Sequence, residues 1–175
     1  MTTFFVPNGR AMNALLPSDC RVAETREARS GFHARYSATG RRYAYRVGLD
    51  ADAKSPFRRP FEWALDFAPE RATLERLARG LRGTHDFRAL AVHTAERENC
   101  RCTIRQAAWV PRIQDRGVEF HVAADRFLHH MVRILVATMI DAALGRRPED
   151  DLGSLLGHDP GVRARTRWTM FSVRS

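Results

Sequence analysis

Three short stretches carry residues that could meet in one chemical site: 41–45 (RRYAY), 85–87 (HDF) and 126–133 (RFLHHMVR). In the last of these, Arg133 places a permanent charge between Val132 and Ile134. A guanidinium in such surroundings requires a carboxylate, a phosphate or water at its tip. The alternative is that Arg133 lies at the edge of an apolar stripe and extends into water.

Each of the other candidates also has a purely structural interpretation. Tyr43 could be a half-buried strand aromatic, and Asp86 is more typical of a turn or a cap than of a catalytic acid. His129 and His130 would point about 100° apart on a helix, which is poor geometry for a shared metal ion. We therefore predict no catalytic role for the two histidines.

The charge of the chain favours a polyanionic partner. The net charge is +9 and the isoelectric point is about 10.8, which favours binding to RNA over binding to an acidic metabolite. Lys54 is the only lysine, a bias that can reflect base composition, so the abundance of arginine does not by itself indicate recognition specific to guanidinium groups. Cys100 and Cys102 have poor spacing for zinc and no second pair, so we predict reduced cysteines on a strand.

Helices and strands that could position these residues follow from hydrophobic spacing. Apolar residues recur at three- and four-residue steps over 127–145, which predicts the longest helix, and over 69–83, which predicts a shorter one. Alternation predicts strands over 20–29, 100–113 and 118–124, the last two joined by a turn at 114–117, and a long strand or hairpin over 32–48. Hairpins interspersed with helices predict an α+β domain, with an antiparallel or mixed sheet and helices packed on one face.

The sequence also bears on location. Arg133 and Asp141 interrupt the best candidate for a membrane span, and the first ten residues lack the pattern of a secretory signal. We therefore expect a soluble, cytoplasmic protein.

Five blocks occur in an order that resembles the tRNA pseudouridine synthase A family. They are 13–17 (NALLP), 31–38 (GFHARYSA), 41–45 (RRYAY), 83–87 (GTHDF) and 126–145. The resemblance implies a pseudouridine synthase fold that isomerises uridines of the tRNA anticodon stem-loop without a cofactor. It also implies a homodimer.

The resemblance implies roles for five residues. Tyr43 matches the active-site tyrosine that stacks on the target base. Arg133 matches the basic residue that pairs with the catalytic aspartate and keeps it ionised. Arg35, Arg41 and Arg42 are implied to contact phosphates of a tRNA whose uridine is flipped out of the stack.

The sequence departs from the family in one chemically important respect. The family's aspartate lies in a Gly-Arg-Thr-Asp-Ala-Gly signature, and none of the eleven aspartates of these 175 residues has this context. Asp52 comes nearest, but it follows the Tyr43 strand, where the family has no nucleophile. The C-terminal residues 163–175 also lack the family's glycine and prolines.

We therefore expect a truncated family member, with 1–30 a remnant of the N-terminal lobe and its connection and 31–175 the C-terminal pseudouridine synthase lobe. Alternatively, a neighbouring chain supplies the missing lobe. Two other functions stay open, a non-catalytic RNA-binding module derived from the family and a basic structural protein.

Overall fold

The computed structural model describes residues 8–92 and 99–157. The chain divides into two units, Met1–Ala38 and Thr39–Ser175. The C-terminal residues 163–175, which lack the family's glycine and prolines, lie outside the described residues.

In the first unit, a short helix, α1 (Gly9–Leu15), is tied to the segment that follows it. The amide of Asn13 donates to the carbonyl oxygen of Val22 (2.9 Å) and accepts from the Val22 N–H (2.7 Å). The strand predicted over 20–29 is wrong, because residues 20–29 are not paired with another strand. An isolated extended segment has no neighbour to complete its hydrogen bonds.

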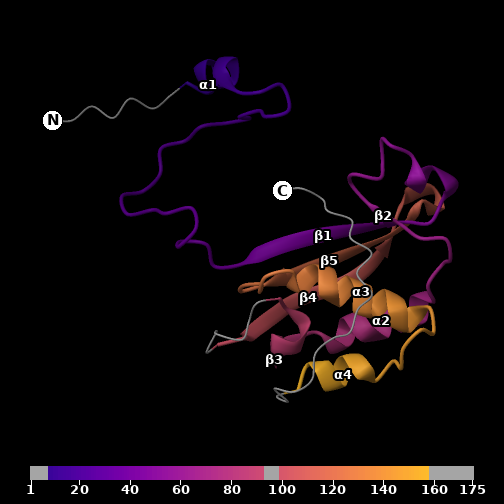
Figure 1. The fold of residues 1–175 in the computed structure, drawn as a ribbon. Coiled ribbons are helices and arrows are strands. Elements are labelled where there is room, and N and C mark those ends of the chain that lie inside the picture. The colour runs from indigo at the N-terminus through magenta and orange to yellow at the C-terminus, as the bar shows by residue number, and fades with distance from the viewer. Residues whose placement is uncertain (1–7, 93–98, 158–175) are drawn as a thin grey trace. The chain divides into compact units, whose positions relative to one another are not determined.

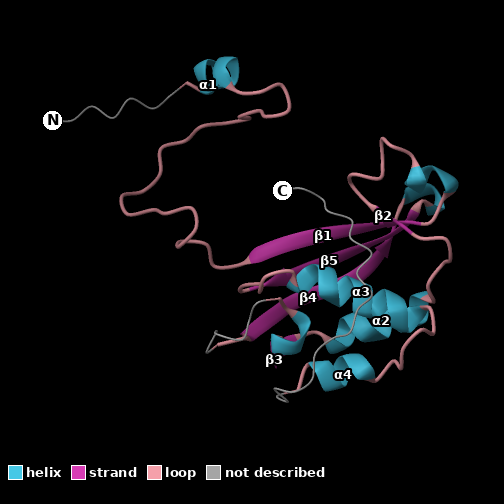
Figure 2. Ribbon diagram, in the orientation of Figure 1, coloured by secondary structure: helices cyan, strands magenta, loops and turns pink. Residues whose placement is uncertain are grey.

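The second unit is built on a five-stranded sheet in the order β2 (Trp63–Ala64), β1 (Arg41–Gly48), β5 (Gly117–Ala124), β4 (Arg101–Pro111) and β3 (Gly83–Asp86). Among the described strands, the β1–β2 pair is parallel and the other three pairs are antiparallel, so the sheet is mixed and mostly antiparallel, as predicted (Figure 2). The predicted β4–β5 hairpin is confirmed. At its turn, Gln114 and Gly117 both have a positive φ (60° and 132°).

Two helices, α2 (Arg71–Gly80) and α3 (Met131–Ala143), cover one face of this sheet (Figures 1 and 2). Their apolar side chains meet those of alternate strand residues in a single core, which includes Leu74, Leu135, Met139, Phe120 and Val122. Burial of such side chains stabilises a fold by roughly 1.5–3 kcal/mol each. A third helix, α4 (Asp151–Leu155), joins the same core through Leu152 and Leu155.

Two predicted elements begin later than expected. The long strand begins only at Arg41, because His33 and Ser37 bond to nearby backbone groups and form a turn instead. The long helix begins at Met131 rather than at residue 127, since His130 has a left-handed backbone (φ 59°). It ends before Gly145, which also has a positive φ (68°) and closes the helix as glycine commonly does.

Ion pairs fix the loop between β1 and β2, which includes the 3₁₀ turn η1 (Ala51–Lys54). The carboxylate of Glu62, only 2% exposed, pairs with Arg112 and with Arg58 (2.6 Å), and Arg58 also pairs with Asp50 (2.6 Å). The hydrogen bond from Arg58 holds the pKa of Asp50 below its usual value. A Cβ at position 48 would lie 2.5 Å from the Cβ of Ala53 and 2.9 Å from Glu62 Oε1, so the glycine there lets the loop pack closely against β1.

Candidate active site

Strand β1 presents Tyr43 and Tyr45 on the helix-covered face of the sheet. In the register with β5, Tyr43 lies opposite Val122 and Tyr45 opposite Phe120, both of which are buried in the core. Residues two apart on a strand share a face, so the two phenols lie in line along β1. Of these two tyrosines, the sequence analysis assigned a role only to Tyr43. The spacing of two residues was a signal that Tyr45 shares its surroundings.

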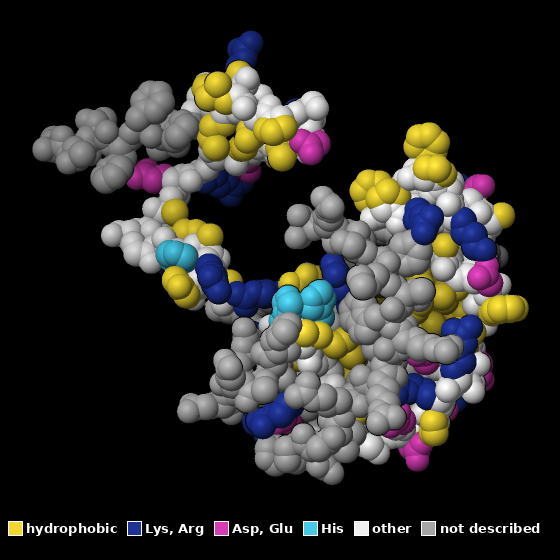
Figure 3. Space-filling model, in the orientation of Figure 1, with side chains coloured by type: hydrophobic (Ala, Val, Ile, Leu, Met, Phe, Trp, Pro, Cys, Tyr) yellow, Lys and Arg dark blue, Asp and Glu magenta, His cyan; other side chains and the backbone are white. Residues whose placement is uncertain are grey.

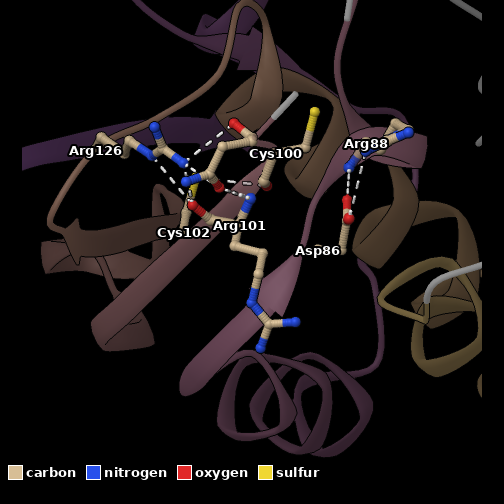
Figure 4. Close-up of polar contacts among 7 residues, drawn as sticks. Asp86, Arg88, Cys100, Arg101, Cys102 and Arg126 are labelled. Atoms are coloured by element: carbon tan, nitrogen blue, oxygen red, sulfur yellow. Dashed lines mark hydrogen bonds and ion pairs between the residues drawn. The ribbon is translucent and has the colours of Figure 1, made fainter. Parts of the chain in front are cut away.

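The segment between β5 and α3 is fastened to the beginning of β4. Asp125 Oδ1 accepts hydrogen bonds from the N–H of Thr103 (2.9 Å) and from that of Arg126 (2.7 Å). The Arg126 guanidinium donates to the carbonyl oxygen of Arg101 (2.6 Å) and to the side chain of Asn99 (2.8 Å) (Figure 4). These hydrogen bonds fix the backbone next to Phe127, which lies outside any helix.

Phe127 in turn positions Tyr43. The two rings meet edge to face, with centroids 5.0 Å apart and planes at 87°. Tyr43 nevertheless keeps 48% of its surface exposed. An aromatic ring that is braced by a neighbour and still accessible can stack against a planar base. Neither Phe127 nor Arg126 was assigned a role from sequence, because their function depends on contacts between segments far apart in the chain.

Arg133 lies in the first turn of α3, partly buried, and its charge acts on the same strand. Burial raises the pKa of the Tyr45 phenol, and the nearby Arg133 cation opposes this by lowering it. The structure therefore places Arg133 within electrostatic range of Tyr45, the neighbour of Tyr43 on the covered face. A cation in this position can hold an incoming carboxylate in its charged form.

The arginines predicted to contact RNA fall into different places. Arg41 and Tyr43 are two residues apart and share a strand face, whereas Arg42 lies on the opposite face; both arginines are exposed. Arg35 belongs to the first unit, where its guanidinium lies 5.9 Å from the centre of the Tyr36 ring. Within the second unit, Arg41 thus shares the strand face of Tyr43, and Arg42 does not.

The other candidates have structural roles. Asp86 Oδ1 accepts a hydrogen bond from the Arg88 N–H (2.9 Å), which confirms the interpretation of Asp86 as a turn residue (Figure 4). His129 and His130 precede α3 and their ring centroids lie 4.0 Å apart, so the helical angle predicted between them is wrong. Within residues 8–92 and 99–157, no three His, Cys, Asp or Glu side chains gather as metal ligands.

The prediction for the cysteines is confirmed in part, since Cys102 lies on β4 whereas Cys100 directly precedes it. Both are buried and neither forms a disulfide, and burial raises the pKa of the Cys102 thiol, with Arg126 opposing the rise. In the part of the chain that the structure describes, no helix is long and apolar enough to cross a membrane.

Comparison with known proteins connects this arrangement to one family. A family model described as tRNA pseudouridine synthase matches residues 77–167, slightly more than half of the chain. The chain is 38% identical over 163 residues to tRNA pseudouridine synthase A of Chlorobaculum tepidum, covering 89% of this chain and 63% of that protein.

Two further relatives bear the same name. The Chlorobium phaeovibrioides protein is 35% identical over 158 residues (89% of this chain and 62% of that protein). The Bacillus subtilis protein is 32% identical over 148 residues (83% and 58%). The chain thus spans about 60% of the length of these curated relatives.

Proposed function

Because the chain belongs to the tRNA pseudouridine synthase family, we propose that it supplies the base-binding wall of a site that isomerises uridine to pseudouridine in the tRNA anticodon stem-loop. The observation that carries this proposal is the position of Tyr43 and Arg133. Tyr43 is a braced, half-exposed ring on β1, and Arg133 acts electrostatically on the next residue of the same strand face. A cytoplasmic location accords with such a substrate.

The proposed roles follow from the chemistry of the reaction. The N1–C1′ bond of the uridine breaks, C5 bonds to C1′, N1 gains a proton and the hydrogen on C5 passes to water. Tyr43 would hold the uracil by stacking, which restrains its plane while permitting rotation within it. Arg133 would keep the family's aspartate ionised for its part in the reaction. No cofactor takes part in this scheme.

The aspartate itself is proposed to come from outside these 175 residues, since their sequence contains no Gly-Arg-Thr-Asp-Ala-Gly signature. In this proposal, residues 31–175 form the C-terminal lobe and residues 1–30 connect it to the lobe that carries the nucleophile. The same missing signature favours the second candidate, an RNA-binding module without catalysis. Joining a segment with the aspartate signature to the chain distinguishes the two, because only the enzyme would gain turnover.

Binding to tRNA tests the part of the proposal shared by both candidates. We expect Arg41→Ala, and to a lesser degree Arg35→Ala and Arg42→Ala, to weaken binding to the anticodon stem-loop. For each phosphate that no longer pairs with an arginine, the slope of log affinity against log salt should fall by about 0.7–0.9. Titrations monitored by fluorescence anisotropy at several salt concentrations would measure this.

The matched control is Arg79→Ala on α2, which removes the same charge from an exposed helical position whose guanidinium bonds to the backbone of Glu75. Equal effects of Arg41→Ala and Arg79→Ala would indicate only a general response to net charge. Affinity indifferent to all three predicted arginines would instead support a basic structural protein.

We also propose that the chain forms a homodimer, and that the loop between β1 and β2 provides the contact surface. Phe57 and Phe61 of this loop, Phe67 after β2 and Ile113 in the β4–β5 turn are each exposed by 68–87%, and Figure 3 shows hydrophobic side chains gathered over this loop. The ion pairs of Glu62 and the Lys54–Asp66 pair hold the segments that carry these residues at one end of β1. Such an exposed apolar cluster is typical of an interaction surface.

Charge favours a second copy of this chain over RNA as the occupant of that surface. Residues 50–67 contain three basic and four acidic side chains, in a chain whose net charge is +9. The mixed charges at the rim can pair across a two-fold axis. Three aromatic rings and one isoleucine would bury on the order of 500 Å² per partner, a large share of the roughly 800 Å² of a typical stable interface.

A double substitution tests the dimer. We expect Phe57→Ser/Phe61→Ser to convert the chain from dimer to monomer in sedimentation equilibrium at micromolar concentrations, because it removes the centre of the apolar contact. Phe32→Ser, which alters an exposed phenylalanine of the first unit, should leave the dimer intact. A wild-type chain that sediments as a monomer at all concentrations would contradict the proposal.

A further inference from the structure

The turn at residues 33–37 (HARYS) is held by its own side chains. The N–H groups of Arg35 and Tyr36 both donate to His33 Nδ1 (3.2 Å each). The His33 N–H donates to Ser37 Oγ (3.0 Å), and the Ser37 N–H donates to the His33 carbonyl oxygen (2.8 Å). Four hydrogen bonds within five residues fix this turn although none of the described residues of the first unit is buried.

The turn displays an aromatic ring and a cation together. The Tyr36 ring lies 4.4 Å from that of His33, at an interplanar angle of 37°, and the Arg35 guanidinium carbon lies 5.9 Å from the Tyr36 centroid. Tyr36 is nevertheless 77% exposed. A large ring that is held in place but left open to water is poorly explained by folding, because it buries little apolar surface.

The surrounding charge indicates the class of ligand. Residues 29–42 contain four arginines and no acidic residue, whereas residues 50–67, which also carry exposed aromatic rings, contain four acidic residues. An exposed ring beside a guanidinium, in a segment without acidic residues, is the combination with which proteins bind single-stranded nucleic acid. The ring provides a face for any base, and the cation provides a phosphate contact.

We propose that the 33–37 turn binds one unpaired nucleotide of single-stranded RNA, with the base stacked on Tyr36 and the adjoining phosphate paired with Arg35. This nucleotide differs from the uridine proposed to lie against Tyr43. His33 is a positioning residue that holds the two contacting side chains through their backbone N–H groups. The inference rests on the proposed function only in taking RNA as the ligand.

The test uses a short single-stranded oligouridylate and an oligonucleotide of the same length with abasic residues, titrated against the full chain. Tyr36→Ala should raise the Kd for oligouridylate roughly 5- to 150-fold, the range expected when one stacked base loses its aromatic partner. It should leave the Kd for the abasic strand unchanged. Tyr36→Phe should bind as the wild type does, since the ring alone is required.

Two further variants serve as controls. Phe32→Ala removes another exposed ring of the first unit, outside the 33–37 turn, and should leave both Kd values unchanged. His33→Ala should weaken oligouridylate binding, and His33→Asn should restore much of it, because an asparagine oxygen can accept the same two N–H groups. A purely structural role for the turn would not distinguish oligouridylate from the abasic strand.

The outcomes separate this inference from the proposed function. If the chain binds the anticodon stem-loop but Tyr36→Ala and Phe32→Ala behave alike, this inference is wrong and the proposed function stands. An equal effect of Tyr36→Ala on the abasic strand would also overturn it. If the wild-type chain binds neither oligouridylate nor tRNA, both proposals fail.

Discussion

Replacing Arg133 by glutamine is expected to lower pseudouridine formation by roughly 30- to several-thousand-fold in a protein that joins this chain to a segment with the aspartate signature. Removing one member of a desolvated charge pair costs about 2–5 kcal/mol, and the unpaired aspartate would acquire a raised pKa. The rate would be measured by release of tritium from C5 of labelled uridine in tRNA. Arg133→Lys should retain part of the rate, because it keeps the charge without the fork of N–H groups.

Two measurements show that the slower reaction comes from the charge at this position. Affinity for tRNA should change by less than about threefold, since the effect lies in the reaction rather than in phosphate binding. The pKa of Tyr45, which Arg133 lowers against the effect of burial, should rise further in Arg133→Gln. An unchanged rate in Arg133→Gln, together with this rise, would show that Arg133 has no part in the chemistry.

Replacing Gly117 by alanine is expected to destabilise the fold by about 3 kcal/mol or more, a large fraction of the roughly 5–15 kcal/mol that stabilises a typical domain. Gly117 has a φ of 132°, and a Cβ at this position would lie 2.0 Å from the carbonyl oxygen of Val47. That oxygen belongs to the backbone of β1, so it can move only if the β1–β5 pairing is disrupted. Urea unfolding followed by circular dichroism would measure the change.

The control is Gly80→Ala at the end of α2, where nothing lies within 4 Å of an added Cβ. This substitution should stabilise the fold by about 0.4–1 kcal/mol, because alanine restricts the unfolded chain. Equal free energies of unfolding for the wild type and Gly117→Ala would contradict the tight contact between β5 and β1.

Much of the second unit could be predicted because its hydrophobic pattern and its burial agree. Leu74 and Leu77 recur at helical spacing and both lie in the core, and the alternation of Val118, Phe120, Val122 and Ala124 follows the buried face of β5. The alternation over 32–38 was misleading. There, His33 and Ser37 form hydrogen bonds with the local backbone, and such bonds compete with strand pairing without leaving a periodic signal.

The candidate site was only partly predictable for a related reason. Tyr43 and Arg133 were identified by resemblance to a family, whereas Phe127, Arg126 and Tyr45 became visible through their contacts. The Arg126 side chain bonds to the carbonyl oxygens of Arg101 and Asn99, which precede it by 25 and 27 residues in the sequence. Phe127 meets a ring on β1. Pairings of this kind depend on the register of the sheet, which spacing along a single sequence does not determine.

The most direct test of the proposed function compares the 175-residue chain with the same chain joined to a segment that carries the aspartate signature. Both proteins would be incubated with tRNA labelled at C5 of uridine, and binding and tritium release would be measured in parallel. We predict that both bind tRNA and that only the joined protein releases tritium. Release by the 175-residue chain alone would show that the nucleophile lies within it, and a failure of both proteins to bind tRNA would contradict the proposed function.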